Sequence, residues 1–376
     1  MKFEIQKSST VLAKPSRYPL NLLILLSLRI FIIEFKTKSE FFMIKFTEER
    51  LLNLFKNFEN VKVAVIGDLM LDRYIWGSVN RISPEAPVPV IEVEGEDSKL
   101  GGAGNVANNI KSLGAFPLLI GVVGDDREGE ILFDLMKREG FNTGGIIVDR
   151  SRPTTVKTRV IAHNQHVVRI DRESREPINY SIQERIKEIV LQNIHQLNAI
   201  IIEDYNKGVI VRNLIHDLID IANKYGIVIT VDPKFDNFFE FKNVTVFKPN
   251  RKEVEDVLGR KIDTEEKVIE AGKILLERLK CEYLLLTRGE KGMTLFTKNG
   301  DVKHIPTKAR KVADVSGAGD TVISTITVAL ASGADIIESA SLANYAAGIV
   351  VEEVGVVPVD KEKLFKAALL DSKGEW

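Results

Sequence analysis

The chain has 376 residues, of which 44% are hydrophobic and 28% are charged, so it can bury a sizeable core and is not disordered as a whole. Its formal net charge is −1, and the lack of a strongly basic segment argues against a nucleic-acid binder. A single cysteine, Cys281, excludes an intrachain disulfide; we expect it to be a core residue and the protein to be cytoplasmic.

The N-terminal segment has basic residues followed by an apolar run, LNLLILLSLRIFII, at residues 20–33. The run is shorter than the about 20 residues of a membrane span, and Arg29 interrupts it. No small-residue cleavage site of a signal peptide follows. We expect no stable membrane insertion and interpret residues 1–42 as an extension that is disordered or arises from a mistaken start codon. A membrane-surface anchor and an extra core helix are the alternatives, and residues 43–376 form the main domain.

From residue 61 onwards, short apolar runs alternate with segments of helical spacing. Buried strands are predicted at residues 61–68, 116–124, 197–204, 226–233 and 282–289. Helices are predicted at residues 104–113, 127–140, 181–196, 209–225 and 264–280. Repeated strand–helix units predict an α/β fold whose mostly parallel sheet is covered by helices on both faces.

Two segments break this alternation and are predicted to form a small β-layer, here called the β-lid. Residues 74–94 are rich in β-branched residues and proline, and residues 154–171 alternate polar and apolar side chains as exposed antiparallel strands do. Such a layer would project from the main sheet, where it could cover a site or pair with another subunit.

Polar residues collect directly after the predicted strands. They are Asp68 and Asp72, residues 204–208, Asp232 and Lys234, Lys248 and Asn250, and Arg288 with Gly289. Ligands of open α/β sheets bind beyond the carboxyl ends of the strands. These residues therefore predict one binding site at that edge of the sheet.

The segment DVSGAGDTVI, residues 314–323, places small residues directly before an apolar helical run. Gly317, Ala318 and Gly319 let a ligand approach the unpaired N–H groups and the positive dipole end of that helix, which makes an anion hole. Asp320 lies in the predicted first turn, where it could cap the helix or accept a proton during phosphoryl transfer. The residues of this stretch do not decide between the two roles.

Two segments together resemble a known family. GGAGNVANNIKSLG, followed by IGVVGDDREGE, is similar to the N-terminal signature of the ribokinase-like (PfkB) sugar kinases, and DVSGAGDTV resembles their C-terminal signature. The segments GDLMLDRYIWGSVNRISPEAPVPVIEV, NQHVVRID, DYNKG, DPK, KPNRKEVE and TRGEKGM resemble the branch that phosphorylates D-glycero-D-manno-heptose 7-phosphate. The resemblance covers residues 45 to about 368 and implies a three-layer α/β/α sandwich with a small β-lid.

The resemblance also implies an activity. An ATP-dependent kinase of this branch phosphorylates the anomeric hydroxyl to give heptose 1,7-bisphosphate, a precursor of ADP-heptose and of bacterial surface polysaccharide. The bifunctional members add a nucleotidyltransferase domain with a His-x-Gly-His motif, which this sequence lacks, so we expect the stand-alone kinase form. The alternatives are another acceptor (ribose, fructose or fructose 1-phosphate) and a non-catalytic sugar-phosphate-binding protein. The segment NRISPEAPVPV favours the heptose branch.

By similarity, Asp320 is the base that deprotonates the acceptor hydroxyl, and Gly317, Ala318 and Gly319 bind the γ-phosphate. Ser316 replaces the usual threonine of this motif and keeps the hydroxyl group.

On the nucleotide side, Asn250 and Glu253 match the family's Asn-x-x-Glu, which helps to place Mg²⁺–ATP. Glu253 would act on the metal directly or through water. The other expected nucleotide-site residues are Lys234, Thr287, Gly289 and Asn344. Asn344 could equally be a buried helix amide, and Phe235, where relatives often have glycine, could alter the approach of Lys234. The sequence does not decide whether the enzyme requires a monovalent cation.

On the sugar side, Asp68 and Asp72 would accept hydrogen bonds from hydroxyl groups, with a cap or turn acid as the alternative. The other residues expected near the sugar or its reacting end are Gly101, Gly102, Asn105, Asp204 and Lys207. Arg81, in the β-lid, is the candidate for the substrate 7-phosphate because a guanidinium can hold it bidentately. Lys157, Arg159 and Arg169 are weaker candidates. The family is usually dimeric, and we expect a homodimer formed through the β-lid.

Overall fold

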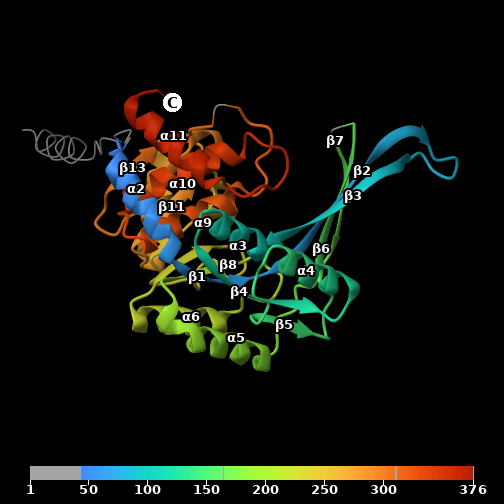
Figure 1. The fold of residues 1–376 in the computed structure, drawn as a ribbon, viewed down its shortest axis with the longest axis horizontal. Helices are drawn as coiled ribbons and strands as arrows, with labels where there is room; N and C mark the ends of the chain where they lie inside the picture. Colours follow the sequence, from blue (N-terminus) through green and yellow to red (C-terminus); the bar gives the residue numbers. More distant parts are fainter. Residues whose placement is uncertain (1–43, 164, 310, 376) are drawn as a thin grey trace, which may run out of the picture. The chain divides into compact units, whose positions relative to one another are not determined.

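The computed structural model describes residues 44–163, 165–309 and 311–375. The extension predicted at residues 1–42 lies outside these ranges. The described chain forms a nine-stranded sheet and a four-stranded sheet (Figure 1). Within these ranges, none of the helices combines the length and the apolar character needed to cross a membrane.

The large sheet is mostly parallel. Its strands are β1 (Lys62–Gly67), β4 (Phe116–Gly124), β5 (Ile146–Asp149), β8 (Ala199–Glu203), β9 (Val228–Asp232), β10 (Val246–Phe247), β11 (Tyr283–Thr287), β12 (Met293–Thr297) and β13 (Val302–Ile305). Their order is β13-β12-β11-β10-β9-β8-β1-β4-β5. All neighbours from β11 to β5 pair in parallel, whereas β12 and β13 pair antiparallel at one edge.

Helices cover both faces of this sheet. They are α2 (Glu48–Asn57), α3 (Ala103–Ser112), α4 (Arg127–Arg138), α5 (Tyr180–Asn193), α6 (Arg212–Tyr225), α7 (Arg251–Leu258), α8 (Glu265–Leu279), α9 (Ala318–Ala331), α10 (Ile336–Val350) and α11 (Lys361–Lys373). Because alternate side chains of a strand point to opposite faces, Val63 and Val65 join the core under α3, α9 and α10, and Ala64 and Ile66 join the core over α5 and α6 (Figure 1). The predicted three-layer α/β/α sandwich is confirmed.

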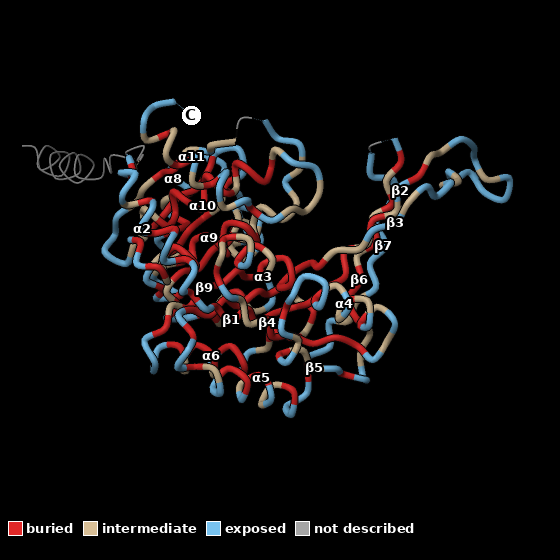
Figure 2. The backbone as a smooth tube through the Cα atoms, viewed as in Figure 1, coloured by how far each residue is buried: buried red, intermediate tan, exposed pale blue. Residues whose placement is uncertain are grey.

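The β-lid is a four-stranded sheet of order β3-β2-β6-β7, made of β2 (Leu69–Ile82), β3 (Pro89–Gly102), β6 (Thr155–Ala162) and β7 (Gln165–Arg172). It is longer than predicted, since β2 starts two residues after β1 and β3 runs directly into α3. Residues 95–102 were missed because GEDSKLGG lacks apolar alternation. The β6–β7 pair is antiparallel as predicted, but β6 pairs with β2 in parallel. All of β7 is exposed (Figure 2).

Capping residues determine where helix α4 begins and ends. Asp126 caps α4, its side chain accepting a hydrogen bond from the Gly129 N–H. Gly140 lies one residue past the C-cap of that helix with φ +70°, close to its predicted position. The remaining predicted strands and helices agree with the structure to within about three residues, the uncertainty expected for element ends.

Candidate active site

The carboxyl ends of β1 and β8 meet at the centre of the large sheet, where the strand order changes direction. Asp68 follows β1 and is fully buried. Its Oδ2 accepts hydrogen bonds from the backbone N–H groups of Tyr205 (2.8 Å) and Lys207 (3.1 Å). Its Oδ1 accepts one from Val209 (3.2 Å). Asp68 therefore fixes the loop after β8. This is the role of a turn acid, which the sequence analysis gave as the alternative to sugar binding.

The same loop carries two further predicted residues, whose side chains contact their own chain. Asp204 accepts hydrogen bonds from the Asn206 N–H (2.8 Å) and the Asn237 amide (3.0 Å). Burial, and then the nearby Asp68, raise the pKa of Asp204 to about 7. The ammonium of Lys207 lies 2.8 Å from a carboxylate oxygen of Glu173.

Asp320 lies buried in the first turn of α9, as predicted. Its Oδ2 accepts a hydrogen bond from the Asn105 amide (2.6 Å), and its Oδ1 accepts one from the Tyr205 hydroxyl (2.9 Å). Burial is the main cause that raises the pKa of Asp320 to about 6; Asp232 adds to it, and the two hydrogen bonds oppose it. The carboxylate is thus largely ionised at neutral pH and can accept a proton.

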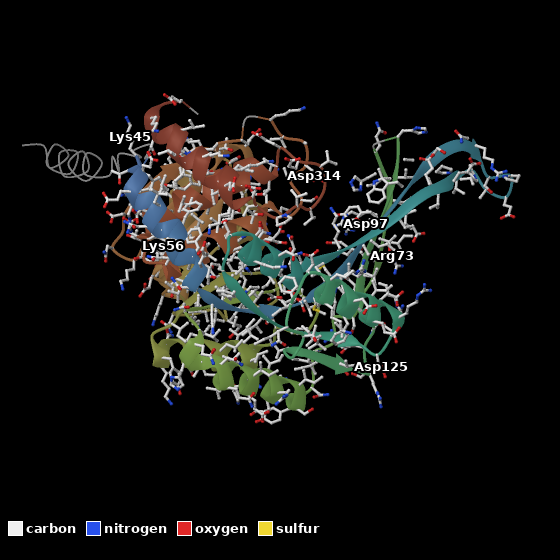
Figure 3. All side chains as sticks on the ribbon, in the orientation of Figure 1. Lys45, Lys56, Arg73, Asp97, Asp125 and Asp314 are labelled. Carbon is white, nitrogen blue, oxygen red and sulfur yellow. The ribbon has the colours of Figure 1, made fainter. Side chains whose placement is uncertain are left out.

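The loop before α9 presents the helix N-terminus to this site. Gly317 precedes the helix with φ +78°, a conformation that favours glycine. Asp314, labelled in Figure 3, fixes the loop by accepting hydrogen bonds from the N–H groups of Ser316 (2.9 Å) and Gly355 (3.1 Å). The Ala318 N–H donates to the carbonyl of Val315 (3.3 Å). The next N–H groups of the first turn have no intrahelical acceptor and carry the positive end of the helix dipole, so they can bind an anion next to Asp320.

Three buried carboxylates converge at the ends of β8, β9 and the start of α9. One oxygen each of Glu203, Asp232 and Asp320 lies within 4.8 Å of the others. The Lys248 ammonium lies 2.8 Å from Asp232 Oδ2. Neither carboxylate oxygen of Glu203 has a hydrogen-bond partner among the described residues. Burial, followed by Asp232 and Asp320, raises the pKa of Glu203 well above its usual range.

Asn250 and Glu253 open α7 and form a capping box. Glu253 Oε2 accepts a hydrogen bond from the Asn250 N–H (2.8 Å), and Oε1 lies 2.5 Å from the Lys234 ammonium. That ammonium also lies 5.1 Å from the ring centroid of Tyr205. Because both Glu253 oxygens already have partners, contact with a metal through water fits the geometry better than direct coordination.

The remaining predicted nucleotide-site residues lie at the end of β11 and on α10. The N–H of Thr287 donates to the carbonyl of Pro249 (3.0 Å), which joins the end of β11 to the start of α7. Gly289 has φ +61° and open space around it. The buried Asn344 donates its amide to the carbonyl of Pro306 (2.7 Å), so it makes the contact of a buried helix amide.

On the lid side of the site, Asp72 of β2 forms an ion pair with Arg159 of β6. The Arg159 guanidinium also lies 5.4 Å from the ring centroid of Tyr74. A Cβ at Gly101 would lie 2.3 Å from Asp72 Oδ2, and one at Gly102 would lie 2.4 Å from the Asp68 carbonyl oxygen. These two glycines are therefore required by the packing of their own chain.

The structure brings only some of the basic lid residues to the site. Arg81 lies nine residues beyond Asp72, roughly 30 Å along β2, with its side chain 67% exposed and its Nε 4.0 Å from Glu92. Arg169 is also mostly exposed, whereas Lys157 is half-buried beside Asp171 (3.2 Å). Of these four basic residues, Arg159 is the one that pairs with a predicted sugar-side residue, Asp72.

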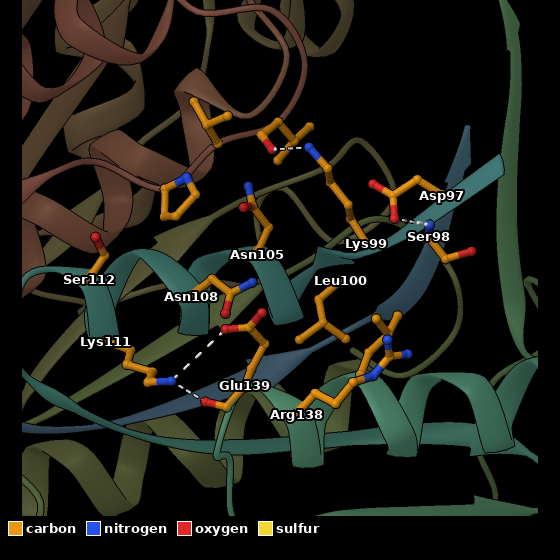
Figure 4. Close-up of a pocket in the computed structure, with 14 residues that line it drawn as sticks. Asp97, Ser98, Lys99, Leu100, Asn105, Asn108, Lys111, Ser112, Arg138 and Glu139 are labelled. Carbon is orange, nitrogen blue, oxygen red and sulfur yellow. Dashed lines mark hydrogen bonds and ion pairs between the residues drawn. The ribbon is translucent and has the colours of Figure 1, made fainter. Parts of the chain in front are cut away.

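A cavity of about 570 Å³ is lined in part by Asn105 (Figure 4). The amide of Asn105 donates to Asp320. It runs along α3 between β3, the end of α4 and residues 356–358. Its basic lining residues are Lys99, Lys111 and Arg138. Asp97 and Glu139 also line the cavity, so its lining is polar and of mixed charge.

Sequence reasoning gave no role to several residues of this site. Asp232, Lys248 and Tyr205 stood out only as polar residues after strands. Glu203 was counted only as part of a predicted strand, at residues 197–204. The signal that could have found them is the alignment of parallel strand ends, which brings β8, β9 and β10 to one edge.

Comparison with known proteins agrees with this geometry. The model of the pfkB family carbohydrate kinase matches residues 60–363. The chain is 42% identical over 318 residues to the bifunctional protein HldE of Pelobacter propionicus, covering 85% of this chain and 65% of that protein. It is 45% identical over 312 residues to HldE of Geobacter sulfurreducens, covering 83% and 64%. It thus spans slightly less than two thirds of the length of these relatives.

Solved structures show the same fold. Arabidopsis thaliana ribokinase, complexed with ribose and ATP, matches with a TM-score of 0.65 at 18% identity, covering 82% of this chain and 98% of that one. Escherichia coli phosphofructokinase-2, in complex with potassium, matches with a TM-score of 0.67 at 19% identity, covering 82% and 97%. With the family match over most of its length, this chain belongs to the pfkB family of carbohydrate kinases, ATP-dependent sugar phosphotransferases that use Mg²⁺.

Proposed function

We propose that this kinase transfers the γ-phosphoryl group of ATP to O1 of D-glycero-D-manno-heptose 7-phosphate, giving ADP and heptose 1,7-bisphosphate on the route to ADP-heptose. The observation that carries the reaction type is the buried, largely ionised Asp320 beside the open N-terminus of α9. The heptose substrate is supported by the resemblance of residues 74–94 to the heptose branch and by the identity of 42% and 45% to two HldE proteins.

In this proposal, Asp320 removes the proton from the O1 hydroxyl as the oxygen attacks the γ-phosphorus. The bond from that phosphorus to the β–γ bridging oxygen breaks, and ADP leaves with the electron pair. The first-turn N–H groups of Gly319 and Asp320, with the helix dipole, stabilise the charge on the transferring group. Asn105 and Tyr205 orient the base through their hydrogen bonds to its two oxygens.

The nucleotide would lie across the ends of β9, β10 and β11. Lys234 is a donor for its phosphates, and Thr287 and Gly289 lie where the chain passes from β11 into the next turn. Mg²⁺ carried by ATP would offset the phosphate charge, with Glu253 holding it through water. Asn250 keeps Glu253 in place through the capping box. Asn344 is better suited to supporting the loop at Pro306 than to contacting adenine.

The sugar would lie between α3 and the β-lid. Asp72 and Asn105 are its proposed hydrogen-bond acceptor and donor, and Gly101 and Gly102 let β3 turn into α3 beside them. Asp68, Asp204 and Lys207 shape the loop after β8. For the 7-phosphate we favour Arg159 over Arg81, because Arg159 already lies against Asp72.

The exposed β7 supports the proposal of a homodimer through the β-lid. Val168 and Ile170 are 47% and 57% exposed on one face of this edge strand. Unpaired strand edges with apolar side chains are favourable pairing surfaces. We place the enzyme in the cytoplasm, since the single buried Cys281 suits a reducing compartment.

The test is ATP turnover by the purified chain against D-glycero-D-manno-heptose 7-phosphate, ribose, fructose and fructose 1-phosphate, with the product phosphate located by NMR. Strong preference for the heptose phosphate with the new phosphate at C1 is expected. Preference for another sugar would overturn the substrate and leave the role of Asp320 intact. No turnover with any acceptor would favour a binding protein.

A further inference from the structure

Arg288 lies between two of the proposed nucleotide-site residues, Thr287 and Gly289, and its side chain is buried, with 5% exposed. The guanidinium makes a two-pronged contact with Glu265, the first residue of α8: Nη2 donates to Oε1 (2.5 Å) and Nη1 donates to Oε2 (2.8 Å). Nη1 also donates to the buried hydroxyl of Thr294 on β12 (3.1 Å). One side chain thus joins the turn after β11 to α8 and to β12.

His304 of β13 completes this contact through one ring nitrogen. Its Nδ1 lies 3.3 Å from Arg288 Nη1 and 2.8 Å from the Thr294 hydroxyl oxygen. A guanidinium can only donate hydrogen bonds, so the Nδ1 that faces it is an acceptor and the ring is neutral, with its proton on Nε2. The buried Nε2 has no hydrogen-bond partner among the described residues and lies 3.8 Å from Glu265 Oε2.

Protonation of His304 would withdraw the support of Arg288. The second proton would go to Nδ1, which would then repel Arg288 Nη1 instead of accepting a hydrogen bond from it. The imidazolium would also compete for Glu265, because a small side-chain movement brings its Nε2–H to Oε2. Burial is the main cause that lowers the pKa of His304; Glu265 opposes it and Arg288 adds to it. The ring is therefore neutral at neutral pH.

From this geometry we infer that Arg288 is a positioning residue for ATP: its anchored side chain holds the turn at Thr287 and Gly289 in the shape that receives the nucleotide, and it does so only while His304 is neutral. The inference rests on the proposed nucleotide site at the end of β11. Gly289 has open space around it and no side chain of its own, so the shape of the turn depends on its neighbour. Stability alone is a weak reason for burying an arginine, because apolar residues of similar volume often stabilise a protein as well.

The test is calorimetric titration of the full chain with Mg²⁺–ATP, without a sugar acceptor, at about pH 8 and about pH 5.5. Arg288→Lys keeps the charge and loses the two-pronged contact, so it should weaken ATP binding at least about tenfold at the higher pH. Glu265→Gln is a second variant at a half-exposed position, where it should fold, and it should weaken binding in the same direction. Arg50→Lys is the matched control, since Arg50 holds Glu338 by the same two-pronged contact (2.8 and 2.6 Å) between α2 and α10. It should bind ATP as wild type does.

The role of His304 is tested by His304→Asn, whose amide oxygen can replace Nδ1 as an acceptor and does not titrate. Wild type should lose ATP affinity at the lower pH, and His304→Asn should lose less. Comparing the two proteins removes the protonation of ATP itself from the result. An equal pH dependence in both would overturn the role of His304.

Lys234→Ala separates this inference from the proposed nucleotide site, because Lys234 is assigned to the ATP phosphates. The role of Arg288 is overturned if Lys234→Ala weakens ATP binding and Arg288→Lys does not. If neither variant weakens it, the proposed nucleotide site fails and this inference fails with it. The expected ATP binding with no turnover on the sugar panel would instead count against the proposed substrate alone.

Discussion

At the scale of single residues, Asp320 is the group on which the proposed chemistry depends. Asp320→Asn keeps the side-chain size and an oxygen that can accept the Asn105 amide, but it cannot take a proton. We expect kcat to fall about 10²–10⁴-fold, the usual contribution of a general base, with ATP affinity retained. Steady-state kinetics and ATP titration would check this. Unchanged turnover would leave Asp320 only as the acceptor of the Asn105 and Tyr205 hydrogen bonds.

The surroundings of Asp320 also predict a pH dependence. Its pKa is raised to about 6, and a base works only when ionised, so kcat should fall as the pH drops below about 6. The hydrogen bond from Tyr205 lowers this pKa, so Tyr205→Phe should move the acid limb of the kcat–pH profile to higher pH. Profiles of both proteins from pH 5 to 9 would measure the shift. A slower variant with an unmoved acid limb would give Tyr205 a structural role.

At the scale of elements, the junction of β3 and α3 places the sugar-side residues. Gly102 has φ +57°, and a Cβ there would lie 2.4 Å from the Asp68 carbonyl oxygen. We expect Gly102→Ala to lower the free energy of unfolding through both backbone strain and this clash. Gly226→Ala is the control for a left-handed position with open space around it, since Gly226 has φ +66° and ψ +32°. Gly102 has ψ −131°, where an alanine is more strained, so its loss includes a larger backbone contribution.

Urea unfolding of both variants would compare the loss of stability at this junction with the loss at an unhindered left-handed position. The control should lose about 1 kcal/mol from strain alone, and Gly102→Ala should lose about 1–3 kcal/mol more. Equal losses would mean that the junction relaxes around the added methyl group. In that case the close packing of Gly102 would not fix the position of α3.

The elements also show where sequence reasoning succeeds. The buried strands β1, β4, β8, β9 and β11 were predicted because each is a short apolar run bounded by polar residues. The inner half of β3 was missed, since its order comes from pairing with β2 and not from its own residues. Tertiary pairing of this kind leaves little trace in the local pattern.

At the scale of the whole molecule, the position of the site at the carboxyl edge of the sheet could be predicted from strand order alone. The contacts within it could not. The motif predicted Asp320, but its partner Tyr205 lies 115 positions away and Asn105 lies 215 positions away. Glu203 was missed because burial without a partner is a property of the folded chain. The local sequence pattern thus predicts where the active site lies. The packing between distant segments determines the hydrogen bonds and the pKa values of the carboxylates within it.

The last prediction concerns assembly through the β-lid. Val168 and Ile170 lie on one face of β7, and a pairing partner would remove their apolar surface from water. Replacing both by lysine should convert the dimer to a monomer, since two charges cannot be buried there without partners. Val148→Lys is the control, because Val148 is 47% exposed on β5, outside the lid. Size-exclusion chromatography with light scattering should find wild type and the control at twice the chain mass and the lid variant at one chain mass. A monomeric wild type, or a lid variant that stays dimeric, would place any partner contact elsewhere.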